Sequence, residues 1–321
     1  MANGTLLLQS TRQAIAGLAE SHDLFAGSEV ALTNLWWQMV GFKSVHPEAS
    51  QADVKAVFAP LLGNKGSNAF NLILQREWTD TVALLSQMRL VSVISIYEGW
   101  LESAALELGL VSKRKRSAWK AFVEPVNASS SINAIEELLG PQFAPMADVA
   151  AVCQASKLCM PTKLLELGSC FRAFKELRNA LAHSGRRASA YTVDKYNEYQ
   201  SVLPSWPGIT KTAPHIPVVV EGEPVEISGY EVVGFSEVLR LMLFTFDGLI
   251  SGTEPAFRAA VRQYQSVHGS TTVWLSSNRA AAKGKLFTTW FNAKLPKPKP
   301  GTGDELVAEL ARRGVIGFRS S

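Results

Sequence analysis

The sequence lacks the short signatures of the commonest enzyme classes. It contains no HExxH zinc motif, no Walker phosphate-binding loop, no GxGxxG dinucleotide fingerprint and no GxSxG nucleophile turn. Its three cysteines, Cys153, Cys159 and Cys170, have no CxxC spacing. An odd cysteine count without that spacing argues against a disulfide framework and against a zinc centre. We therefore expect no metal, no cofactor and a reducing, cytoplasmic environment.

Long apolar runs are missing as well. The richest stretch, 90–111, is interrupted by Glu98, Glu102 and Glu107. A bilayer span needs about 18 or more largely uncharged apolar residues, so we expect no membrane-spanning helix. The N-terminus, MANGTLLLQSTRQ, has neither the basic start nor the long apolar core of a secretory signal. An apolar content of 47% over 321 residues is instead typical of a globular chain with a large core.

The net charge of +4 is unevenly distributed along the chain. Residues 1–110 and 191–254 carry net charges of −4 and −6, whereas residues 111–190 and 255–321 carry +6 and +8. Two basic segments point weakly to a polyanionic partner such as RNA. They are equally explained if they face the acidic segments within the fold or across a dimer, and the sequence leaves both explanations open.

Apolar residues recur at helical spacing along most of the chain, which predicts a mainly α-helical fold. One buried face in the stretch 70–110 is marked by Leu90, Ile94, Tyr97, Leu101, Ala104 and Leu108. The KRKR run at 113–116 is expected to form a solvated basic turn, with binding to an RNA backbone as the alternative, and GNKGSN (63–68) is expected to form a loop. The predicted helices cover 5–20, 28–42, 51–62, 70–110, 130–140, 145–158, 161–185, 192–203, 235–250, 254–266, 278–292 and 304–314.

One segment differs from the helical pattern. Residues 215–228, HIPVVVEGEPVEIS, are rich in β-branched residues on both sides of an EGE turn, which predicts a small β-hairpin with edge strands. We divide the chain into N-terminal helices packed on the core (1–69), a helical core that includes the hairpin (70–254) and a basic C-terminal extension (255–321). The extension contains a Pro-rich linker at 295–301 and ends in VIGFRS, a terminal strand or tail.

The helix predicted at 161–185 ends in the most informative stretch, ELRNALAHSGRR (176–187). Relative to Phe174 on the apolar stripe, Asn179 and His183 fall at about 140° and 180° around the helix axis. Arg172 and Glu176 fall on the same side, at about 160° and 200°. This polar face is predicted to point away from the core, and the i,i+4 spacing lets Asn179 hydrogen-bond to His183.

Arg178 is the exception, because its angle of about 40° places it within the apolar stripe. A guanidinium group there must extend outward along the surface or find a carboxylate partner. The sequence therefore raises the question of what holds Arg178.

These side chains suit the cleavage of RNA without a metal ion. Histidine titrates near neutral pH and can take the proton from a ribose 2′-hydroxyl. Arginine presents a planar fork to phosphate oxygens as negative charge develops, and asparagine can orient the imidazole. One helix supplies a single histidine, His183, so a full acid–base pair requires a second copy related by a two-fold axis.

RNALAH (178–183) resembles the R-x4-6-H motif of HEPN-domain proteins, including the polar residue directly after the arginine. VSVISIYEGWLESAALEL (91–108) is similar to the early apolar helix of many HEPN families, which carries a glutamate in its middle. The resemblance extends over roughly 70–250 in helix order. It implies a helical bundle, a homodimer formed around the motif helix, and metal-independent endoribonuclease activity in toxin–antitoxin or antiviral defence systems.

The resemblance also implies roles for individual residues. Arg178, Asn179 and His183 carry over as catalytic residues, Glu98 as the partner of Arg178, and Glu176 as a supporting residue. RNA would be the substrate, and an antitoxin or regulatory protein a partner.

The basic residues around the motif have two explanations. Arg172, Arg186 and Arg187 are candidates for binding RNA phosphates. Arg186 and Arg187 are equally explained as residues that cap the carbonyl groups of a helix end. The alternative function is a HEPN-like dimerisation or RNA-binding module that does not cut RNA and acts as a regulatory partner.

Overall fold

The computed structural model describes residues 8–58, 70–123, 158–183 and 185–250, with short pieces at 258–259, 262, 266, 273–276 and 316–319. The loop predicted at 63–68, the helices at 130–140, 278–292 and 304–314, and the linker at 295–301 lie outside these residues, as do nearly all of 145–158 and most of 254–266.

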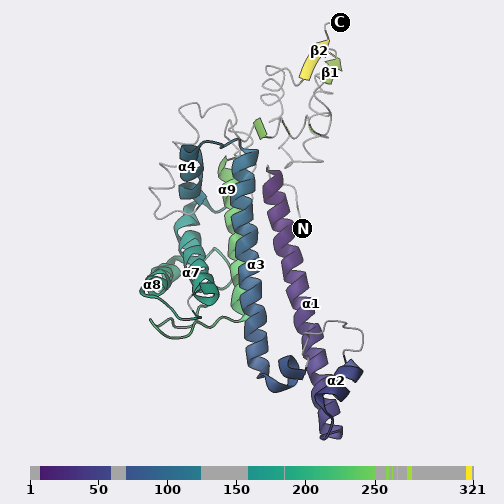
Figure 1. Cartoon of the computed structure of the whole chain (residues 1–321). Helices are drawn as coiled ribbons and strands as arrows, with labels where there is room; N and C mark the ends of the chain where they lie inside the picture. The colour runs from purple at the N-terminus through teal and green to yellow at the C-terminus, as the bar shows by residue number, and fades with distance from the viewer. Residues whose placement is uncertain are drawn as a thin grey trace.

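The described part of the chain is mainly helical, as predicted (Figure 1). Its helices are α1 Gln9–Val45, α2 Gln51–Phe58, α3 Trp78–Glu107, α4 Lys113–Val123, α7 Leu164–His183, α8 Ala190–Val202 and α9 Gly229–Ile250. Shorter helical turns are Asn71–Gln75, Pro161–Lys163 and Leu203–Ser205. Two strands, β1 Val273–Ser276 and β2 Ile316–Arg319, pair in parallel. No helix of the described residues is long and apolar enough to cross a membrane.

Helix α3 is the centre of the bundle. Figure 1 shows α1 and α9 lying alongside it over much of its length, while α7 packs against α3 and α9 and carries α8 on its outer side. The predicted apolar face is buried, with Leu101 partly exposed, and Val93 and Trp100 are buried beside it. Because α1, α7 and α9 cover α3 from different sides, its buried surface is wider than one stripe.

Stacked aromatic rings fix α7 against its neighbours. Phe174 stacks on Phe235 of α9 with ring centroids 4.3 Å apart and an interplanar angle of 3°. Phe171 lies 4.8 Å from Tyr97 of α3. All four rings are fully buried, and burial of each such side chain contributes about 1.5–3 kcal/mol. The motif helix is thus held along its length by the core.

The prediction of two separate N-terminal helices at 5–20 and 28–42 is wrong, because α1 is continuous from Gln9 to Val45. The expected break at 21–27 contains no proline, and a single glycine, Gly27, costs a helix only about 1 kcal/mol. Packing offsets that cost: Ser21 is buried and its hydroxyl lies 3.1 Å from that of Ser92 on α3.

The predicted β-hairpin at 215–228 is not formed. The turn is present around Gly222, whose φ is 79°, but the flanking residues do not pair with each other. They pair instead with the segment that leaves α7: Ala188 N–H donates to the Glu223 carbonyl at 3.0 Å, and Val225 N–H to the Arg186 carbonyl at 2.7 Å. The β-branched segment therefore hydrogen-bonds to the residues that follow the motif helix.

Other helix starts also differ from the prediction. The stretch predicted as one helix at 70–110 consists of the turn Asn71–Gln75 and α3, which begins at Trp78. Helix α9 begins at Gly229, six residues before the predicted 235, because Ser228 and Glu231 form a reciprocal cap: the Ser228 N–H donates to Glu231 Oε2 at 2.6 Å. The KRKR run at 113–116 is not a turn but the first turn of α4.

Carboxylates from other helices hold the N-terminus of α1. Its N-cap, Leu8, has no side chain able to accept a hydrogen bond. Glu107, at the end of α3, accepts from the N–H groups of Gln9 and Ser10 at 2.8 and 2.9 Å. Asp247 of α9, which is fully buried, accepts from the Leu8 N–H at 3.0 Å. Negative charge at the positive end of the helix dipole ties α1 to both neighbours.

The substitution Glu107→Gln should lower the free energy of unfolding by about 1–2 kcal/mol, because the variant loses the charge and one of two acceptor oxygens. Urea denaturation followed by circular dichroism measures the change. Glu20→Gln, at an exposed position of α1, is the matched control and should leave the midpoint unchanged. Equal midpoints for wild type and Glu107→Gln would contradict the role of this carboxylate.

Candidate functional site

The helix predicted at 161–185 is present as α7, Leu164–His183. It follows the turn Pro161–Lys163, and the Met160 N–H donates to the Thr245 hydroxyl of α9 at 3.0 Å. It ends at His183, and Gly185 then takes a φ of 59°, a left-handed conformation that glycine adopts without strain. Arg186 also has a positive φ, 68°. The two residues turn the chain sharply away from the helix axis.

Arg178 pairs with Glu98, the partner that the resemblance implied. Its Nη2 donates to Oε1 of Glu98 on α3 at 2.7 Å. The Arg178 side chain is only 18% exposed, whereas that of Glu98 is 37% exposed. A half-buried guanidinium is therefore neutralised by a carboxylate that still contacts solvent, which resolves the placement of Arg178 in the apolar stripe.

A second cation shares the same carboxylate. Lys175, one turn before Arg178 on α7, has its ammonium nitrogen 3.8 Å from Glu98 Oε1. The same ammonium lies over the ring of Phe171, 5.5 Å from its centroid. Glu98 Oε1 is thus contacted by two cations from the same helix.

The polar end of α7 is open to solvent. His183 is exposed, and no hydrogen bond or ion pair joins its imidazole to any residue that the structure describes. Asn179 is half-buried and donates to Glu176 Oε1 at 3.1 Å, rather than to His183 as expected. Glu176 therefore orients the asparagine, while the imidazole remains free to meet a ligand or a second chain.

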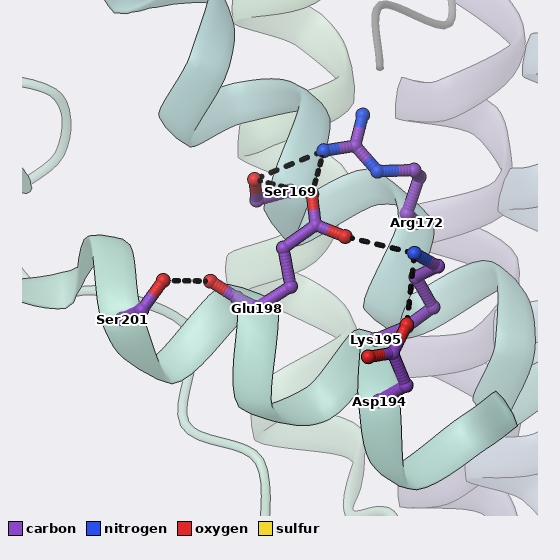
Figure 2. A network of polar contacts seen from close by, with 6 residues as sticks. All are labelled: Ser169, Arg172, Asp194, Lys195, Glu198 and Ser201. Atoms are coloured by element: carbon purple, nitrogen blue, oxygen red, sulfur yellow. Dashed lines mark hydrogen bonds and ion pairs between the residues drawn. The ribbon is translucent and has the colours of Figure 1, made fainter. Parts of the chain in front are cut away.

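Arg172 does not belong to this open end, contrary to the prediction that it points outward. Its guanidinium pairs with Glu198 of α8 and donates to the Ser169 hydroxyl at 3.1 Å (Figure 2). Lys195, also on α8, approaches Glu198 at 3.1 Å. The helix wheel could not foresee this contact, because α8 folds back over the face of α7 that carries Arg172.

Burial and partner charges act in opposite directions on Glu198. Removal from solvent raises its pKa, but the hydrogen bonds and positive charges of Arg172 and Lys195 together outweigh burial and hold the pKa below its ordinary value. The network in Figure 2 therefore keeps Glu198 ionised and fastens α8 to α7.

The two arginines after the helix are placed differently from each other. Arg187 donates from Nη1 to the carbonyl of Gly222 at 2.6 Å. This bond joins the segment after α7 to the turn at Gly222. The side chain of Arg186 is exposed and makes no side-chain bond within the described ranges. Of the three arginines expected to bind RNA, Arg186 is the one whose guanidinium is open to a phosphate.

The described cysteines are poor nucleophiles. Burial raises the pKa of the Cys170 thiol far above its usual range, and it raises the pKa of Cys159 to about 11 with help from the charge of Asp247. Both therefore remain thiols near neutral pH. Among the residues that can be described, no three His, Cys, Asp or Glu side chains gather as metal ligands.

A cleft that the sequence did not reveal lies beside the Arg178–Glu98 pair. It has a volume of about 490 Å³ and is formed by α3, α4 and α7. Its lining residues are Glu98, Leu101, Glu102, Ala105, Leu106, Arg116, Trp119, Lys120 and Lys175. The helical spacing of Arg116 and Lys120 is visible in the sequence, but the packing of α4 against α3 is not.

Comparison of the chain with protein-family models, with curated proteins and with solved structures yields no significant match. The resemblance to HEPN-domain proteins therefore rests on the motif and on the order of the helices.

The coupling between Arg178 and Glu98 can be measured with a double-mutant cycle. Arg178→Met and Glu98→Gln should each lower the free energy of unfolding by about 1 kcal/mol, and the double variant should fall short of their sum by about 0.5–1 kcal/mol. Glu102→Gln, one turn along α3, serves as the control and should be additive with Arg178→Met. If the effects of Arg178→Met and Glu98→Gln on the free energy of unfolding simply add, the result would argue against the contact.

The Glu198 network predicts a defined pH dependence. A carboxylate whose pKa is lowered by folding stabilises the protein above its ordinary pKa of 4.5, and the stabilisation is lost as the pH falls through the lower folded value. Glu198→Gln should therefore cost about 1 kcal/mol at pH 7 and progressively less below pH 4.5. Chemical denaturation at a series of pH values tests this. Glu226→Gln, at an exposed position, is the control, and its effect on the free energy of unfolding should not change with pH.

Proposed function

We propose that this chain is a HEPN-like, metal-independent endoribonuclease, acting as a toxin or antiviral-defence effector in the cytoplasm. The observation that carries the proposal is the arrangement at the end of α7. Arg178 is held by Glu98, while His183 stands exposed five residues further along the same helix. A positive group and a titratable group are thus presented together on one rigid element.

The chemistry follows from these two groups. One histidine takes the proton from a ribose 2′-hydroxyl, and the 2′-oxygen attacks the neighbouring phosphorus. The bond from phosphorus to the 5′-oxygen breaks, and the departing oxygen takes a proton from a second histidine. The products are a 2′,3′-cyclic phosphate and a free 5′-hydroxyl. Arg178 and the exposed Arg186 would stabilise the charge on the phosphate oxygens.

The second histidine would come from a second copy of the chain. Between Glu166 and Leu181 no residue of α7 is exposed, whereas Ala182 and His183 are. Exposed apolar side chains lie on the segments next to the end of α7: Tyr191, eight residues after His183, is 57% exposed, and Val220, two residues before the Gly222 that bonds to Ala188, is 52% exposed. These exposed apolar side chains support a homodimer that brings two motif ends together.

One observation favours the second candidate function, a non-catalytic dimerisation or RNA-binding module that regulates a partner. The guanidinium of Arg178 already has a carboxylate partner, and a structural arginine would be held in the same way. On this reading the motif stabilises the α3–α7 contact, and RNA binding would survive the loss of His183.

The deciding experiment is cleavage of total RNA and transfer RNA in the presence of EDTA. Wild-type protein should cut, and His183→Ala should reduce the rate about 100-fold or more, because a general base contributes at least that factor. His215→Ala, in the extended segment, is the matched control and should retain the wild-type rate. Inert wild-type protein, or a His183→Ala variant that cuts equally well, would reject the nuclease.

Expression in a bacterial host gives an independent test of the toxin role. Wild-type protein should slow growth, and Arg178→Ala or His183→Ala should relieve the effect because each removes a group required for cleavage. A neighbouring gene product that binds the chain and restores growth would be the antitoxin or regulatory partner. Growth inhibition that persists in both variants would contradict toxicity through RNA cleavage.

A further inference from the structure

Helix α1 is apolar on two opposite sides over its second half. On its inner side it packs with α2 and the turn Asn71–Gln75 around the buried residues Met39, Val54 and Ile73. On its outer side it exposes Val30, Trp37 and Val45, by 61%, 62% and 71%. A helix that is apolar all round is normally buried, so the outer side indicates a partner that the described residues do not supply.

The exposed residues of this outer side form one continuous face. We define the outer face by six exposed residues that lie within about 60° of Asn34 around the helix axis: Gly27, Val30, Asn34, Trp37, Gly41 and Val45. The face is about 27 Å long. The two charged residues in this range, Glu29 and Lys43, lie about 140° and 180° away from Asn34. A partner is therefore expected to be apolar and uncharged where it touches α1.

The glycines of the outer face point to a helix as the partner. Glycine destabilises a helix relative to alanine, so its presence in a helix interior usually has a packing reason. Gly17 has such a reason, because a Cβ added there would lie 3.6 Å from a side-chain atom of Ile96 on α3. A Cβ added at Gly27 or Gly41 meets no described atom within 4 Å. Close approach of another backbone would explain both of these glycines.

The spacing of large and small residues on the outer face is self-complementary. If two α1 helices run antiparallel about a two-fold axis at Asn34, Gly27 of one chain lies opposite Gly41 of the other. Trp37 then lies opposite Ala31, a small exposed residue at the edge of the face. The two Asn34 side chains meet on the axis, where each amide can donate to the other and accept from it. An isologous interface requires this kind of reciprocal match.

A parallel arrangement of two α1 helices lacks this match. It would place Trp37 against Trp37 and Val30 against Val30, with no small residue to receive either side chain. It would also bring the carboxylate of Asp23 close to that of the other chain, and like charges repel. The antiparallel arrangement places Asp23 opposite Val45 instead.

We infer that the outer face of α1 pairs in an antiparallel manner with the same face of a second copy, about a two-fold axis at Asn34. The inference goes beyond the proposed function: α1 precedes the range that resembles HEPN-domain proteins, and it lies on the opposite side of α3 from α7 (Figure 1). The pairing thus leaves the end of α7 open. A strip of about 27 Å by about 10 Å is smaller than the roughly 800 Å² per partner of a standard interface, so the pairing should be reversible.

Cross-linking of the full-length protein locates the axis. Every variant carries Cys153→Ser, and the remaining Cys159 and Cys170 react poorly because both stay protonated. Asn34→Cys should give a covalent dimer with a short bismaleimide, because the two copies of residue 34 meet. Ala16→Cys is the matched control: it is exposed at the same angle on α1, but its two copies would be about 54 Å apart along the helices. Equal yields from the two variants, or no covalent dimer from Asn34→Cys, would overturn the inference.

A mixture of two variants tests the direction of the helices. Ala31→Cys and Trp37→Cys proteins should cross-link to each other in greater yield than either does to itself, because the antiparallel pair brings positions 31 and 37 together. Mass spectrometry distinguishes the mixed dimer from the other two. A parallel pair would give the reverse result and reject the inferred register.

Two double variants test whether the outer face drives the pairing. Val30→Glu with Trp37→Glu places like charges across the axis and should lower the yield of the Asn34→Cys dimer about 10-fold or more. Val218→Glu with Tyr230→Glu makes the matched change at residues that are 79% and 75% exposed elsewhere, and it should leave the yield within about 2-fold. An equal loss in both would reject the outer face.

The substitution Ala31→Trp gives a second test that adds no charge. It fills the space opposite Trp37 and should lower the yield of the Asn34→Cys dimer about 5-fold or more, while the melting temperature shows whether the bundle is intact. An intact variant with an unchanged yield would overturn the pairing. A chain that is inert on RNA would reject the proposed function alone, and the cross-linking yields would still decide the pairing.

Discussion

The burial of α3 on several sides is the constraint on which the rest of the structure depends. Tyr97 and Trp100 are locked into the core by aromatic neighbours on α7, α4 and α9. Glu98 lies between these two anchors in sequence, so its backbone cannot shift without disturbing the packed rings. Phe174 fixes α7 in the same way. The Arg178–Glu98 contact is therefore set by packing, and the ion pair follows from where the core places the two helices.

The contribution of this ion pair to stability depends on how deeply each of its two side chains is buried. An exposed pair contributes little to stability, and a buried pair recovers its desolvation cost only with good geometry. Arg178 is largely buried and Glu98 is not, so the arginine loses most of its hydration while the carboxylate keeps some. The pair thus fixes the position of the Arg178 guanidinium at a modest cost in desolvation free energy. That is useful for binding a phosphate, and it is equally what a structural arginine between two helices requires.

Periodicity in the sequence was sufficient to predict the presence of α3, α7 and α8, but not where α3 begins, and it predicted the side of α7 on which Arg178 lies. The identity of its partner needed the family resemblance, because nothing local links position 98 to position 178. Contacts created by helix packing could not be predicted: Arg172 pairs with Glu198 only because α8 folds back over α7, and the 222–225 segment pairs with 186–188 rather than with itself. The cap at Ser228 and Glu231 was readable and was missed, since the pattern S-x-x-E precedes an apolar run.

The position of α8 also limits how a second chain could complete a site. Because α8 and its Glu198 network cover the Arg172 side of α7, a partner helix cannot lie along the whole motif helix. The exposed residues at this end are Ala182, His183, Gly185 and Arg186. A two-fold axis would therefore pass near the ends of two α7 helices, where the chain turns at Gly185 and is closed by the 222–225 segment. In such a dimer each Arg178 would remain on its own Glu98 while the two histidines meet, so the loop after α7 would set the separation between them.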